Sequence, residues 1–220
     1  MTGLLTFRWS GQTGYASSSP SSGCIRRQRQ PSDMRDIELE ARCSRTRLGG
    51  EPLPEDLRIL FEHRDALWKS TGIELNGDPD WAPWRDTGYL TEADWADPEI
   101  AANVKAIHSV CDAIAFFAAH EDGEYFGYWR GPEGPAIADS PLATLDHEGQ
   151  FRFCGGGNFG VALLFRKLGE ERFCELRDWL QSIGITDPVR SVDDFADPSG
   201  VSSPGALHRE LYAGILGGRA

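Results

Sequence analysis

Apolar and polar residues alternate with the period of an α-helix in five parts of this chain. Two of the five segments start at clear N-terminal signals: Pro54, with acidic residues in the following turn, and the pair Asp97-Pro98. Two more start at residues suited to capping a helix, Asn158 and Ser203. The pattern predicts helices over residues 54–69, 97–111, 158–168, 171–183 and from 204 onward.

Between the second and third predicted helices, the pattern changes to short apolar runs separated by turns. Residues 114–118 and 125–129 flank Asp122-Gly123, a dipeptide typical of tight hairpin turns. Residues 142–145 and 151–154 repeat this arrangement around a second polar turn. We therefore expect two hairpins in an antiparallel or mixed sheet. Because helices and strands are segregated along the chain, the order predicts an α+β fold and not a doubly wound parallel sheet.

Composition divides the chain near residue 34. The first 33 residues contain four arginines against one aspartate, a net charge of +3, and a Ser-rich stretch without a periodic apolar face. Residues 34–220 contain 18 basic and 33 acidic residues, a net charge of −15. We predict that 1–33 is a disordered or mis-annotated leader, or else a basic tail with its own role, with translation starting at Met1 or Met34. Residues 34–184 then form the main domain, and 185–220 a C-terminal extension with a final helix.

The whole chain has the composition of a globular protein. Of its 220 residues, 40% are hydrophobic and 25% are charged. Its longest apolar run, residues 113–119, is far shorter than the roughly 20 residues that a membrane-spanning helix needs. The five cysteines are an odd number and none has CxxC spacing, which favours a reducing compartment. We expect a cytoplasmic protein without membrane association.

Charge and aromatic residues together indicate a binding surface. The net charge of −12 makes nucleic acid a poor partner and favours a basic protein. Residues 78–99, which we expect to be mostly loop, carry seven acids against Arg85 and three tryptophans. Tryptophan is enriched at binding hot spots, although these rings could instead only close the edge of the core. The candidate partner-binding residues are Trp81, Trp84, Asp86, Asp94, Trp95, Asp122, Glu124 and Trp129.

Three other groups of residues could carry chemistry. Residues 155–160 match G-x-G-x-x-G before a predicted helix, but no second strand with a ribose-binding acid follows, so a strand-to-helix turn capped by Asn158 is favoured over a nucleotide site. His120-Glu121-Asp122 and His147-Glu148 could hold a metal ion, although polar hairpin turns are ordinarily solvated. Cys154 and Cys174 lie among apolar residues, where a thiol is usually inert. We predict no catalytic residue, cofactor or metal.

Several short motifs resemble the SUKH superfamily, which includes fungal cell-wall-assembly regulators and bacterial immunity proteins. Residues 50–57, GEPLPEDL, resemble the LP-x-x-L opening helix of that family. Residues 116–127, FFAAHEDGEYFG, are similar to its central strand, acidic glycine turn and strand, and residues 141–149, PLATLDHEG, to its next strand and turn. The helix after Asn158 stands where the family has its closing helix. The resemblance covers about residues 48–168.

The resemblance implies a SUKH-like α+β fold, with helices packed on a central antiparallel or mixed sheet and flanking N- and C-terminal helices. It also implies, as in many bacterial members, a non-enzymatic immunity protein that binds and neutralises a toxin, often a nuclease. The charge of residues 34–220 agrees with this expectation, since a nuclease has a basic substrate cleft that an acidic surface can complement. Two alternatives stay open: a regulatory or scaffolding protein without a toxin partner, and a metal-assisted hydrolase built on the two hairpin turns. The sequence does not define the oligomeric state.

Overall fold

A five-stranded antiparallel sheet forms the centre of the molecule. The structure, a computed structural model, describes residues 31–164, 170–186, 198 and 200–218. The sheet has the strand order β1-β2-β3-β4-β5, so each strand pairs with its neighbour in the sequence. This confirms the α+β class and both predicted hairpins. The strands are β1 (Ile73–Leu75), β2 (Ile114–His120), β3 (Tyr125–Trp129), β4 (Leu142–Leu145) and β5 (Phe151–Phe153).

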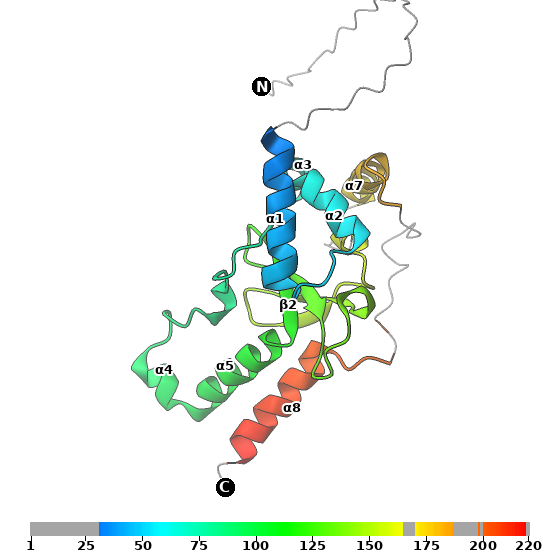
Figure 1. Cartoon of the computed structure of the whole chain (residues 1–220). Coiled ribbons are helices and arrows are strands. Elements are labelled where there is room, and N and C mark those ends of the chain that lie inside the picture. The colour runs from blue at the N-terminus through cyan, green and yellow to red at the C-terminus, as the bar shows by residue number, and fades with distance from the viewer. Residues whose placement is uncertain (1–30, 165–169, 187–197, 199, 219–220) are drawn as a thin grey trace, which may run out of the picture.

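Five helices cover the first face of the sheet (Figure 1). Their apolar side chains form one large buried cluster with Phe117, Phe126 and Tyr128, which point to this face from β2 and β3. Alternate residues of a strand point to opposite faces, so these side chains lie on one side of the sheet. The helices are α1 (Pro31–Arg47), α2 (Glu55–Glu62), α3 (Arg64–Thr71), α6 (Phe159–Leu163) and α7 (Glu170–Ser182).

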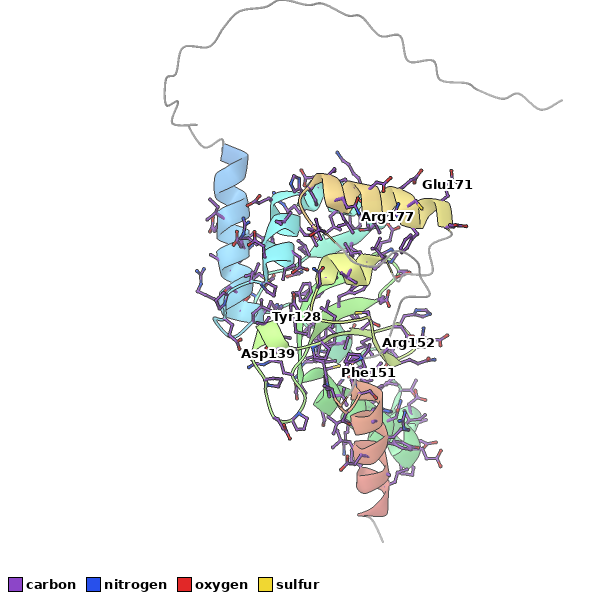
Figure 2. The ribbon with its side chains drawn as sticks, turned by 90° about the vertical axis from the view of Figure 1, so that its right-hand side faces the viewer. Tyr128, Asp139, Phe151, Arg152, Glu171 and Arg177 are labelled. Atoms are coloured by element: carbon purple, nitrogen blue, oxygen red, sulfur yellow. The ribbon has the colours of Figure 1, made fainter. Side chains whose placement is uncertain are left out.

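The second face has a different cover. Two helices, α5 (Pro98–Cys111) and α8 (Pro204–Gly217), pack against each other and against this face, where Phe116, Trp129 and Leu145 lie. Figure 2 shows Phe151 of β5 next to the start of α8, and Glu171 and Arg177 on α7 at the other end of the molecule. Trp81 and Trp84 complete the cover from residues 78–97, a segment that contains the 3-10 helix η1 (Pro83–Arg85). Further along it, the short helix α4 (Glu92–Ala96) packs against α5.

Next to a β-bulge in β2, the position of Gly127 in β3 requires a residue without a side chain. The register between β2 and β3 shifts between Phe116 and Ala118, so that Phe117 and Ala118 both contribute to the core of the first face. A Cβ atom on Gly127, opposite the bulge, would lie 2.5 Å from the Ile114 side chain and 2.8 Å from the Ala115 carbonyl oxygen. Only glycine allows the two strands this close approach.

Several predicted boundaries differ from the observed ones. The helix expected over 54–69 is two helices, α2 and α3, which meet at His63. The sequence analysis missed α1, α4 and β1, whereas the helices over 97–111, 171–183 and from 204 onward are confirmed within a residue or two. The helix expected over 158–168 begins as predicted, but its residues 165–168 lie outside the described residues, as does most of the predicted leader.

The C-terminal residues take part in the same fold. Ile185 is 2% exposed and belongs to the core of the first face, and α8 packs along α5 and against β5. The predicted C-terminal extension therefore includes residues that close both faces of the sheet. No described helix combines the length and the apolar character needed to cross a lipid bilayer.

Candidate protein-binding surface

Helix α1 holds the start of the acidic segment 78–97. Thr46 Oγ1 donates a hydrogen bond to the Gly77 carbonyl oxygen at 2.9 Å, and the Arg47 guanidinium donates one to the Asp78 carbonyl oxygen. The same guanidinium lies 5.1 Å from the centre of the Trp81 ring, a distance at which cation–π attraction operates. The conformation of the segment is thus anchored by a helix that the sequence analysis did not predict.

Trp81 and Trp84 pack down onto the sheet. The Trp84 ring centre lies 4.3 Å from that of Phe116 and 5.6 Å from that of Tyr125, and Trp81 meets Trp84 edge to face at 5.1 Å. Both tryptophans are half-buried and pack against the core of the second face. They close the edge of the core, as the second interpretation of these rings proposed, and they give the segment a rigid base.

Trp129, the fourth tryptophan among the candidate residues, lies inside the molecule. It is 2% exposed, and its indole Nε1 donates a hydrogen bond to the Ser202 carbonyl oxygen at 2.9 Å. This bond links β3 to the turn before α8, so Trp129 supports the packing of the C-terminal helix. A partner cannot reach this side chain in the folded protein, and we remove it from the candidate surface.

The outer side of the segment presents two aromatic residues to solvent. Tyr89 is 75% exposed and Trp95 is 42% exposed, and both belong to the small set of large hydrophobic residues exposed in the described part of the chain. Trp95 lies on α4, which begins with a capping box: Asp94 and Thr91 exchange hydrogen bonds at the helix N-terminus. The cap stabilises the N-terminal end of this short helix, from which Trp95 is exposed.

Acidic residues surround these aromatic side chains, and most of them are exposed. Hydrogen bonds from the Thr91 hydroxyl and amide lower the pKa of Asp94. Arg85, the only base between residues 78 and 99, forms an ion pair with Asp112 beyond this segment. We name residues 85–99 the acidic aromatic surface. Its exposed carboxylates belong to Asp86, Glu92, Asp97 and Glu99.

Asp122 and Glu124, the remaining predicted binding residues, lie on the turn between β2 and β3. The Asp122 side chain is 59% exposed and contacts His120 Nδ1, while Glu124 is half-buried. The next residue, Tyr125, meets the Trp81 ring edge to face, with ring centres 5.9 Å apart. The turn therefore joins the anchored base of the acidic segment, whereas Asp94 and Trp95 lie on α4, which packs against α5.

The two hairpin turns proposed as a metal site do approach each other. A Cβ atom on Gly123, at φ +90°, would lie 3.7 Å from the His147 Cβ atom. Even so, no three His, Cys, Asp or Glu side chains of the described ranges are grouped so that they could hold a metal ion. The geometry brings the turns together without assembling the ligand set that the metal-assisted alternative needs.

The glycine-rich segment 155–160 is occupied by a carboxylate of the protein itself. The amides of Phe159 and Gly160, at the start of α6, donate hydrogen bonds to Asp56 Oδ2, and Asn158 caps the helix through the Val161 amide. Burial raises the pKa of Asp56, and these amide hydrogen bonds oppose the rise. The position that a nucleotide phosphate would take is filled, which supports the structural interpretation of this motif.

Sequence reasoning placed Asp56 only in the first turn of a helix, where the helix dipole stabilises a negative charge. The structure gives it a second role, since it joins α2 to α6 across the core. Its two partners, Phe159 and Gly160, lie more than 100 positions further along the chain. An acid in the first turn of an amphipathic helix is too common to reveal such a contact. The role of Arg47 was also missed, because its partners Asp78 and Trp81 lie on another segment, which a local sequence pattern does not place beside it.

The described cysteines have the character of packing residues. Cys43, Cys111 and Cys154 are buried, and burial raises the pKa of Cys43 and of Cys111 to about 12. Burial also raises the pKa of Cys154. A thiol with a raised pKa carries little nucleophilic thiolate at neutral pH. These three side chains are therefore poor candidates for a covalent mechanism, in agreement with the sequence interpretation of Cys154.

Comparison of the chain with models of known protein families, with curated proteins and with solved structures finds no match.

Proposed function

We propose that this protein is a non-enzymatic immunity protein of SUKH type, which binds and neutralises a basic partner protein, most simply a nuclease toxin, through the acidic aromatic surface. The observation that carries the proposal is the exposure of Tyr89 and Trp95 among four exposed carboxylates on one anchored segment. An exposed tryptophan surrounded by polar groups is the usual composition of a binding hot spot.

Charge supports the choice of a basic partner. Residues 78–99 carry a net charge of −6, and residues 34–220 a net charge of −15. A surface of one sign accelerates association with a surface of the opposite sign, up to about 10⁸–10⁹ M⁻¹s⁻¹ at low salt. The same field repels the phosphate backbone of nucleic acids. A nuclease has the opposite requirement, a basic cleft that holds phosphates, so the acidic aromatic surface is suited to cover such a cleft.

The half-buried tryptophans support this function indirectly. Trp81 and Trp84 hold the segment against the sheet through their contacts with Phe116 and Tyr125. Because the segment is ordered before binding, less conformational entropy is lost when a partner docks. Of the residues predicted from the sequence, Asp86, Asp94 and Trp95 therefore act at the surface, and Trp81 and Trp84 act as its support. Asp122 and Glu124 extend the acidic area at the base.

The test is a pull-down with the full chain as bait in a lysate of the source cells, at low and at high salt, with captured proteins identified by mass spectrometry. We expect one basic protein, retained more strongly at low salt. The double variant Glu92→Lys and Glu99→Lys, which leaves the capping residues Asp94 and Asp97 unchanged, should abolish its capture. Trp95→Ala should weaken capture without changing its salt dependence.

A matched control makes the same change in charge elsewhere. Glu133 and Asp139 are exposed on the connection between β3 and β4, where Figure 2 labels Asp139. The variant Glu133→Lys and Asp139→Lys should retain the partner, because the charge reversal lies outside the acidic aromatic surface. If both double variants behave alike, or if binding and its salt dependence stay unchanged in Glu92→Lys and Glu99→Lys, the acidic aromatic surface is not the binding site.

A further inference from the structure

A cavity at the other end of the molecule carries chemistry that the acidic aromatic surface does not use. It has a volume of about 850 Å³ and lies between the C-terminal end of α3, the turn after β2, and α7. This volume is within the range of small-molecule sites, about 300–1,000 Å³. Figures 1 and 2 place α3 and α7 together at the end of the molecule opposite α8.

The wall formed by α3 and the turn contributes an indole, a cation and a carboxylate. Trp68, 46% exposed, and Lys69 belong to the last turn of α3, and Glu121 follows β2. The Glu121 amide donates a hydrogen bond to the Gly72 carbonyl oxygen at 3.0 Å. Gly72 has φ +68°, and a Cβ atom there would lie 3.0 Å from the Glu121 carboxylate. The absence of a side chain at Gly72 lets this carboxylate lie against the helix end.

The wall formed by α7 contributes the same three chemical groups. Arg172, Glu175 and Trp179 all line the cavity, and their spacing of three and four residues puts them on one face of the helix. Each wall therefore offers an indole ring, one positive charge and one negative charge. The floor between the walls is apolar, because Leu163 and Leu176 are buried there.

The four charged groups of the cavity do not neutralise one another. Within the described residues, neither Lys69 nor Arg172 forms an ion pair, and neither do Glu121 and Glu175. Other arginines of the chain, such as Arg58 and Arg130, do pair with nearby carboxylates. A ligand with a single charge would meet attraction and repulsion at once, whereas a ligand with both charges can satisfy both kinds of side chain.

We propose that this cavity binds a small zwitterionic molecule with an apolar or aromatic centre, of which a free aromatic amino acid is the simplest representative. Its ammonium group pairs with the carboxylates of Glu121 and Glu175, and its carboxylate with Lys69 and Arg172. Its centre lies between Trp68 and Trp179, where offset stacking and cation–π attraction add to burial. The proposal does not depend on the partner of the acidic aromatic surface.

Three probes of similar shape separate the charge requirements. At about pH 6, below the pKa of an α-amino group and above that of an α-carboxyl group, L-phenylalanine is zwitterionic, L-phenylalanine amide is a cation and N-acetyl-L-phenylalanine is an anion. We would titrate each into the full chain by calorimetry and by ligand-observed NMR at fixed ionic strength. Loss of one charge-assisted contact should weaken binding roughly tenfold or more. The zwitterion should therefore bind at least about tenfold more tightly than either singly charged probe.

Charge-neutralising variants assign each contact. Arg172→Gln should weaken the zwitterion and the anion but leave the cation unchanged, and Glu121→Gln should do the reverse. All these side chains are exposed, so the variants should fold, and circular dichroism checks this. Glu171→Gln, on α7 but outside the cavity, is the matched control and should change nothing. The proposal is overturned if no probe binds at millimolar concentration, or if all three bind alike in every variant.

Discussion

The two faces of the sheet are closed in different ways. On the first face, five helices bury a continuous apolar cluster, and the one carboxylate buried in the described part of the chain, that of Asp56, is held by backbone amides. On the second face, α5 and α8 leave part of the sheet to an irregular segment that carries Trp81 and Trp84. The inner side of that segment completes the core, and its outer side is the acidic aromatic surface. On the second face, one segment therefore both completes the core and carries the proposed binding surface.

Two adjacent phenylalanines of β2 test this difference most strongly. Phe117 packs against Tyr128 and Phe159 on the first face, with ring centres 5.0 and 4.8 Å away, and Phe116 packs against Trp84 on the second. Both are at most 2% exposed, so each change to alanine should lower the free energy of unfolding by about 3–5 kcal/mol. Chemical unfolding measures these losses.

Hydrogen exchange then distinguishes the two faces. In Phe116→Ala we expect faster exchange of the amides between residues 81 and 97 under native conditions, because the Trp84 ring loses its support. In Phe117→Ala this segment should exchange as in the wild type until the whole domain unfolds. Equal exchange of the segment in both variants would show that its anchoring does not depend on the second core.

The next largest effect concerns the buried carboxylate. Asp56→Ala leaves the amides of Phe159 and Gly160 buried without acceptors, and should lower the free energy of unfolding by about 1–3 kcal/mol. Asp56→Asn keeps an acceptor and is the matched control, with a smaller loss. If alanine and asparagine are equally tolerated, the contact between α2 and α6 contributes nothing measurable.

The same variants predict a pH effect with a defined sign. Burial raises the pKa of Asp56 in the folded state above its ordinary value of 3.8, so protonation of this group favours folding. Its contribution is fully present below pH 3.8 and is lost as the pH rises through the folded-state pKa. Relative to wild type, Asp56→Asn should therefore gain stability as the pH rises from 4 to 7, and thermal unfolding at several pH values measures this difference.

Local patterns were sufficient to predict most of the secondary structure, for reasons visible in particular elements. The hairpins follow from strand-forming runs around Asp122-Gly123, and α5 follows from the Asp97 cap and its apolar stripe. Strand β1 has three residues, too few to show an alternating pattern, and α1 has a weakly amphipathic sequence next to a polar leader. Both depend on tertiary contacts, which a local pattern does not contain.

The candidate surface was predicted only in part, because the exposure of a side chain also depends on tertiary contacts. Sequence identified the acidic segment and its tryptophans, but it could not separate the half-buried Trp84 from the exposed Trp95, since both lie among acids and small residues. It placed Trp129 on the surface, whereas the alternation of β3 directs this ring into the second core. Tyr89, the most exposed large hydrophobic side chain of the described residues, was not singled out, because a lone tyrosine in a loop carries no pattern.

A smaller effect than that of Asp56 is expected where α8 covers the second face. His208 is stacked on Tyr212 and tilted against Phe151, and its buried Nε2 atom has no hydrogen-bond partner among the described residues. Burial lowers the pKa of His208 below 6.5; a backbone hydrogen bond at Asn103 opposes this, and the nearby Arg209 adds to it. The unfolded chain therefore binds the proton more readily, and stability should decrease as the pH falls below 6.5.

The matched variant for this prediction is His208→Gln, which does not titrate. We expect the midpoint of thermal unfolding to fall more in the wild type than in the variant between pH 7 and pH 5.5. Hydrogen exchange should locate the difference in α8 and in the part of α5 that it covers. Parallel curves for the two proteins would mean that protonation of His208 is not coupled to the packing of the second face.

The smallest effect on stability is expected at Trp95, and it makes the comparison between supporting and exposed tryptophans most direct. Trp95→Ala removes a 42% exposed side chain and should change the free energy of unfolding by no more than about 0.5 kcal/mol. Iodide quenching should show a smaller quenchable fraction of tryptophan fluorescence than in wild type. The background variant Trp68→Phe removes the other indole that is exposed in the described part of the chain. A loss of stability as large as that of Phe116→Ala would mean that Trp95 belongs to the core. The proposed binding surface would then lack a tryptophan side chain that is not already required for folding.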